Sequence, residues 1–106
     1  MFYNHMMIER KASLEELSGN LSTDRSRLEK ELALAPERKV LLVENASYAD
    51  MVTGNYRTDY KPVSFMATLQ TFWHRYDFPI MWMPDRRYSG LFIRQYCEYY
   101  IKELLK

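Results

Sequence analysis

The sequence predicts an α/β fold in which a small, mainly parallel central sheet is flanked by helices. Short apolar segments at residues 40–43 and 79–83 alternate with stretches whose apolar residues recur at helical spacing. Strands that alternate with helices in this way favour a parallel sheet. The chain has 106 residues, 47% of them hydrophobic and 27% charged, which suits one domain with a modest core. Residues 1–106 are therefore expected to form a single domain.

The first part of the chain predicts a strand and then a short helix. Aromatic and apolar residues give way to charged ones over residues 2–11, as in a strand that runs out of a core into a site. Ser13 and Glu16 have the spacing of a capping box at a helix start. Gly19 and Asn20 predict the end of this helix.

The next segment predicts a second helix and a buried strand. Ser22 or Thr23 can cap a helix with one charged face, and this helix must end at Pro36. Residues 40–43 form an unbroken apolar run that ends in Glu44. Such a run is typical of a strand that is buried on both sides.

Two longer helices and a third strand are predicted after a short helix. Ser47 can cap the short helix, which Gly54 closes. Pro62 begins the next helix, residues 79–83 form the third strand, and Ser89 is expected to cap the last helix. The apolar face of the first long helix consists of Phe65, Leu69, Phe72 and Tyr76, and that of the last helix of Phe92, Ile93, Tyr96, Cys97, Tyr100, Ile101 and Leu104.

Composition excludes several classes of protein. Lys and Arg total 15 against 14 Asp and Glu, so any anion-binding surface must be local. Cys97 is the only cysteine, which excludes an intrachain disulfide or a thiolate zinc cage and favours a reducing, cytoplasmic compartment. The apolar runs are too short to cross a bilayer, and residues 1–10 lack the features of a signal peptide. Because the chain opens directly in strand-like sequence, we expect it to be the later part of a longer gene product.

The segment Glu9-Arg10-Lys11 is the strongest chemical signal in the sequence. We expect Glu9 and Lys11 to lie on one face of a central strand, with their tips within about 8 Å of each other at the mouth of a concave surface, and Arg10 to lie on the other face. A carboxylate can bind Mg²⁺, and a lysine two residues further on can orient a water or neutralise charge on a phosphate. Metal-dependent nucleases use this arrangement, but a solvated strand end has the same sequence.

Further residues strengthen the nuclease interpretation. Glu9-Arg10-Lys11, the acid Glu15 after three residues, a basic helix at residues 24–29 and the strand at residues 41–44 resemble the XPF-type nuclease domain. The hallmark of that family is G-D, a short gap, E-R-K, three residues and D, on a restriction-endonuclease-like core. The resemblance extends from Met7 through the last helix, and lone domains of this type occur in phage and prophage genomes.

The resemblance implies a function and a set of site residues. It implies a DNA endonuclease that hydrolyses phosphodiester bonds with Mg²⁺ or Mn²⁺, with Glu9 as metal ligand and Lys11 as catalytic lysine. Arg10 matches the invariant arginine of the family, and Arg25 or Arg27 matches a helix arginine that faces the site. The sequence departs from the family pattern because Glu15 replaces the closing Asp and because residues 1–8 contain neither the G-D pair nor any carboxylate. The first metal ligand is therefore missing.

Several residues have a second, purely structural interpretation. Arg25 and Arg27 could simply pair with acids at helical spacing. Glu44 could support Arg10 or anchor the next helix. Arg57 and Lys61 lie among tyrosines, a pattern that can contact sugar-phosphate and bases but also occurs in surface loops. The tyrosines of the last helix favour a core or an interface over a base-stacking platform.

The expected partners follow from the resemblance and from the last helix. DNA is the expected substrate, and a helicase or a DNA-binding domain is a possible partner. A homodimer is expected because family members pair through this domain and because the apolar stripe of the last helix is wide. The alternative function is a catalytically impaired nuclease fold that serves DNA binding or dimerisation. A bacterial or phage-encoded cytoplasmic protein is expected.

Overall fold

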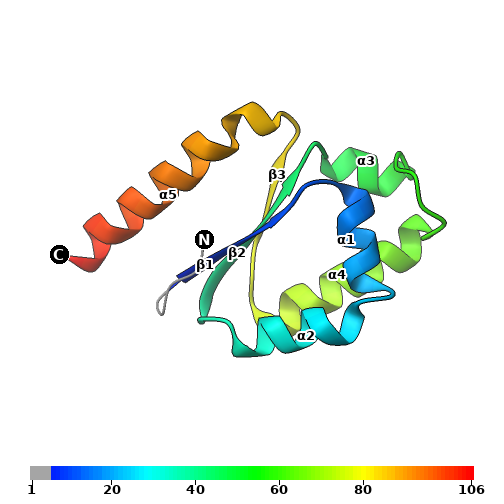
Figure 1. Ribbon diagram of the computed structural model, residues 1–106, viewed down its shortest axis with the longest axis horizontal. Helices are drawn as coiled ribbons and strands as arrows, with labels where there is room; N and C mark the ends of the chain where they lie inside the picture. The colour runs from blue at the N-terminus through cyan, green and yellow to red at the C-terminus, as the bar shows by residue number, and fades with distance from the viewer. Residues whose placement is uncertain (1–5) are drawn as a thin grey trace.

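The computed structural model describes residues 6–106 as a three-stranded sheet with helices on both faces (Figure 1). The strands lie in the order β1-β2-β3, and both pairs are parallel. The predicted α/β fold with a small parallel sheet is therefore confirmed. The elements are β1 (Met6–Lys11), α1 (Leu14–Leu21), α2 (Arg25–Leu34), β2 (Arg38–Glu44), α3 (Tyr48–Thr53), α4 (Pro62–Tyr76), β3 (Ile80–Met83), η1 (Arg86–Tyr88) and α5 (Ser89–Leu104).

The middle strand is β2, whose residues 40–43 are buried as the apolar run predicts. The prediction that the strand carrying Glu9 is central is wrong for the described residues, since β1 lies at an edge of the sheet. Nevertheless β1 is buried on both faces: Met7 is 7% exposed and Ile8 3%. Residues 2–5 of the predicted strand lie outside the described residues.

Side chains that alternate along the strands divide the core into two layers. Leu41 and Val43 pack with α1, α2 and α4, whereas Val40 and Leu42 pack with partly buried residues of α5. In Figure 1, α5 lies on one side of the sheet, and α1, α2, α3 and α4 lie on the other. One face of the sheet is therefore covered by α5, and the other by α1, α2, α3 and α4, which we call the helical layer.

The helix boundaries agree with the sequence except at three positions. Ser47 caps α3 and Gly54 closes it with a φ of 77°, both as predicted, and Asp50 completes a capping box with Ser47. Helix α1 continues past Gly19 to Leu21, because Leu21 is only 2% exposed and its packing favours another half-turn. Asp24, rather than Ser22 or Thr23, precedes α2.

The third difference concerns α5. Its N-cap position is Tyr88, and Ser89 is the first helical residue rather than the cap. The helix covers the sheet with its first turns and then projects from the body of the molecule, whose extents are 46 × 29 × 17 Å (Figure 1). Ile101 and Leu104 are therefore 51% and 57% exposed, so the apolar stripe only partly caps the sheet. No helix within residues 6–106 is long and apolar enough to span a membrane.

Candidate functional site

Glu9 and Lys11 form an ion pair on one face of β1. The Nζ atom of Lys11 lies 3.1 Å from Oε1 of Glu9, and the two side chains are 9% and 31% exposed, respectively. The prediction that the two tips lie on the same face within about 8 Å is confirmed. The pair lies near the carboxyl end of β1, and ligands of open α/β sheets bind outside the carboxyl ends of the strands.

Arg10 points to the opposite face and binds Glu44 with two hydrogen bonds. Its Nε and Nη2 atoms donate to the two carboxylate oxygens of Glu44, and each donor–acceptor distance is 3.1 Å. Glu44 is 3% exposed and also accepts a hydrogen bond from Ser89 Oγ at 2.5 Å. The predicted partner of Arg10 is confirmed, although the Arg10 side chain is 57% exposed. One buried carboxylate thus joins β1, β2 and α5.

The charges around Glu44 keep it ionised. Burial raises the pKa of Glu44, but hydrogen bonds from Arg10 and Ser89 and the positive charges of Arg10 and Arg86 outweigh burial, so its pKa lies below the ordinary value. Neither the contact of Ser89 with Glu44 nor the place of Arg86 near Glu44 was predicted from the sequence. The only sequence signal for Arg86 is its place in the Asp85-Arg86-Arg87 run after the third strand.

Glu15, which stands where the family has its closing Asp, binds the backbone of a distant loop. Its Oε2 atom accepts a hydrogen bond from the backbone N–H of Arg57 at 2.7 Å. This bond is the main reason that the pKa of Glu15 is lowered. The predicted DNA-contacting residue Arg57 is exposed and lies beside the start of α1. Lys61 is also exposed and takes the N-cap position of α4.

Arg25 and Arg27 are held on the surface of α2 by acidic neighbours. Arg25 lies 3.3 Å from Glu29 and covers the ring of Phe72, while Arg27 pairs with Asp24 at 3.7 Å. These partners belong to the helical layer and not to β1. Ion pairs at helical spacing therefore account for the observed contacts of Arg25 and Arg27. A role of these two arginines in DNA binding stays a prediction.

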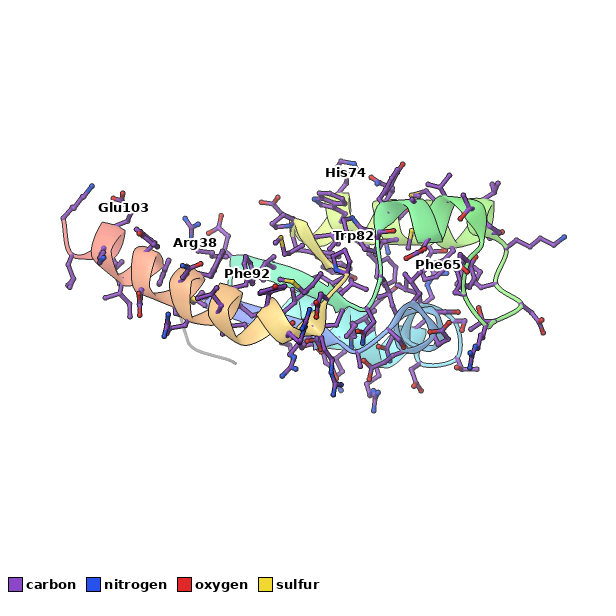
Figure 2. The ribbon with its side chains drawn as sticks, turned by 90° about the horizontal axis from the view of Figure 1, so that it is seen from above. Arg38, Phe65, His74, Trp82, Phe92 and Glu103 are labelled. Atoms are coloured by element: carbon purple, nitrogen blue, oxygen red, sulfur yellow. The ribbon has the colours of Figure 1, made fainter. Side chains whose placement is uncertain are left out.

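Two open grooves lie at the amino ends of the strands, away from Glu9 and Lys11. The first is about 690 Å³ and is lined by Arg38, Glu103 and the aromatic residues of α5. The second is about 510 Å³ and adjoins it at Arg38 and Tyr96. Figure 2 shows Arg38, Phe92 and Glu103 along α5, far from Phe65 in the helical layer. Neither groove supplies the concave surface that the sequence analysis predicted at Glu9.

Glu9 offers a divalent cation a single carboxylate ligand. Mg²⁺ is commonly bound through one or two carboxylates, with waters and substrate phosphates completing the octahedron. Within residues 6–106 there is no group of three His, Cys, Asp or Glu side chains that could hold a metal ion. Glu9 can therefore serve as one ligand but does not make a complete metal site.

Comparisons with known proteins do not assign the chain to a family. No family model matches the chain, and no curated protein or solved structure gives a significant match. Functional conclusions therefore rest on the residues and their geometry.

Proposed function

We propose that this chain is a divalent-metal-dependent DNA endonuclease domain with a restriction-endonuclease-like core. The observation that carries the proposal is the Glu9–Lys11 pair, with 3.1 Å between its charged atoms, near the carboxyl end of a strand in a parallel sheet. The substrate is the DNA backbone, and a cytoplasmic protein of bacterial or phage origin would encounter it. The resemblance of the Glu9-Arg10-Lys11 segment to the XPF-type nuclease domain supports the same reaction.

Each residue of the pair has a distinct role in this proposal. Glu9 binds the cation, which, when bound, polarises the phosphate and lowers the pKa of the attacking water. Lys11, whose stem is buried, places an ammonium group beside Glu9 and offsets negative charge that develops on the phosphate. Arg10 binds Glu44, which links β1 to β2 and so helps to position its two neighbours.

A second candidate function is a DNA-binding or dimerisation module whose chemistry is impaired. The specific observation in its favour is that Glu9 is the only carboxylate that the described part of β1 contributes. Glu15 and Glu44 are engaged elsewhere, by the Arg57 backbone and by Arg10. Two-metal phosphodiester cleavage needs carboxylates on more than one element, so a ligand from outside this set is required.

The chain as given is therefore expected to cleave DNA weakly. Incubation of plasmid and branched DNA with the purified protein, with Mg²⁺, with Mn²⁺ and with EDTA, measures this directly. Slow nicking that EDTA abolishes supports the endonuclease domain. DNA binding without any cleavage favours the module instead, and the absence of both contradicts the endonuclease and the DNA-binding module and leaves only a dimerisation module.

We also propose that the chain forms a homodimer through α5. The projecting half of the helix exposes Tyr99, Ile101 and Leu104 beside the 690 Å³ groove, and tyrosine and arginine are enriched at interface hot spots. Isologous packing would let the exposed apolar residues of each copy cover the groove of the other.

The dimer is expected to give twice the chain mass in light scattering at roughly 100 μM, where an interface with a Kd of about 1 μM is largely occupied. Ile101→Glu should convert it to a monomer without loss of helix content, because Ile101 is half exposed in the single chain. Val63→Glu, on the exposed surface of α4, is the matched control. A monomer mass for the wild-type chain at this concentration would contradict the proposed interface.

A further inference from the structure

The segment after β3 brings Arg86, a cationic residue beside Arg10, to the α5 side of the strand ends. Met83 ends β3 opposite Glu44, and Asn45 N donates to Met83 O at 2.8 Å. The strand ends are therefore held together, and η1 begins at Arg86 directly beyond them. Arg10, Glu44 and Arg86 thus come from three adjacent strand ends.

The positive charges of Arg86 and Arg10 both act on a single carboxylate, that of Glu44. Arg87 is neutralised by Asp85, whose Oδ2 atom lies 2.6 Å from Arg87 Nη2, and Arg10 is paired with Glu44. For Arg86, no ion pair with a carboxylate is found within residues 6–106. Its side chain is exposed. The excess positive charge on this side of the strand ends therefore lies on Arg86.

We infer that Arg86 contacts a DNA phosphate on the α5 side of the strand ends. This inference rests on the proposed function and adds a residue that binds the substrate backbone. Because side chains alternate along β1, Glu9 and Lys11 face the helical layer while Arg10 faces α5. A DNA backbone that crosses the carboxyl ends of the strands would meet the Glu9–Lys11 pair on one face and Arg86 on the other. The planar guanidinium is well suited to a phosphate.

The inference is tested by DNA binding without cleavage. Fluorescence anisotropy of a labelled duplex, in EDTA and over a series of salt concentrations, gives the Kd and its salt dependence. Arg86→Ala is expected to weaken binding several-fold and to reduce the magnitude of the salt slope by about 1, as expected for one lost phosphate contact. Arg86→Lys should recover most of the slope, because the charge is retained. The matched control is Arg94→Ala, an exposed arginine of α5 that pairs with Glu98 at 3.8 Å.

The outcomes separate this inference from the proposed function. If the wild-type chain binds DNA and Arg86→Ala has the wild-type Kd and salt slope, Arg86 makes no phosphate contact and the inference is wrong, while the proposed function stands. An Arg94→Ala variant that loses as much affinity as Arg86→Ala would also overturn it, since the effect would then be one of overall charge. A wild-type chain that neither binds nor cleaves DNA overturns both.

Discussion

A Glu9→Gln variant is expected to lose at least about 100-fold of the metal-dependent DNA cleavage that the wild-type chain shows. The amide keeps the shape of the side chain but not its charge, so the candidate cation ligand is lost. A bound cation supplies several kcal/mol of stabilisation to the transition state, and about 1.4 kcal/mol corresponds to a tenfold change in rate. The measurement is the initial rate of plasmid nicking with Mn²⁺, the more permissive of the two cations.

Lys11→Met should cause a comparable loss while leaving the fold intact. The Lys11 side chain is 9% exposed, and the thioether has similar length, so the buried stem is retained and only the ammonium group is removed. Glu98→Gln is the matched control, because Glu98 is an exposed acid of α5 in an ion pair with Arg94. Cleavage that survives both substitutions would show that the site lies elsewhere. If the wild-type chain cleaves DNA fast and both substitutions abolish cleavage, another ligand completes the metal site. The expectation of weak cleavage would then be wrong.

Much of the fold could be predicted because its signals are local. The apolar run at residues 40–43 specifies a strand buried on both faces, and β2 is that strand. The cap at Ser47 and the glycine that closes α3 act only on the residues of that short helix. The Glu9–Lys11 pair is local as well, since alternation along a strand is enough to bring the two side chains together.

The features that the sequence could not predict depend on distant contacts. Ser89 matches the pattern of a helix cap, but its hydroxyl donates to Glu44, 45 residues away in the sequence. Glu15 has the spacing of the acid that ends the family motif, but its carboxylate accepts a hydrogen bond from the backbone N–H of Arg57 in a distant loop. Gly19 favours a helix end, yet burial of the following residues extends α1 by another half-turn. In each case a tertiary contact outweighs the local preference.

A Glu44→Ala variant is expected to lower the free energy of unfolding by roughly 2 to 4 kcal/mol. The substitution removes both hydrogen bonds from Arg10 and leaves the buried hydroxyl of Ser89 without its acceptor. A hydrogen bond to a charged group contributes about 1.5 to 3 kcal/mol, and an unsatisfied buried donor costs about 1 to 3 kcal/mol. The expected loss is smaller than these contributions added together, because Arg10 is 57% exposed and regains hydration when Glu44 is removed.

Urea denaturation followed by circular dichroism measures this loss, and its pH dependence identifies the carboxylate as the cause. The pKa of Glu44 is lowered in the folded chain from the ordinary value near 4.5. Its stabilising contribution is therefore present above that value and is lost as the pH falls through the folded-state pKa. The stability difference between wild type and Glu44→Gln should accordingly be largest near pH 7 and shrink below about pH 4.5. Glu31→Gln, an exposed acid of α2 paired with Arg27, should differ from wild type by less than about 0.5 kcal/mol. A difference for Glu44→Gln that stays constant from pH 7 to pH 3 would mean that packing, and not the charge of Glu44, joins the strands to α5.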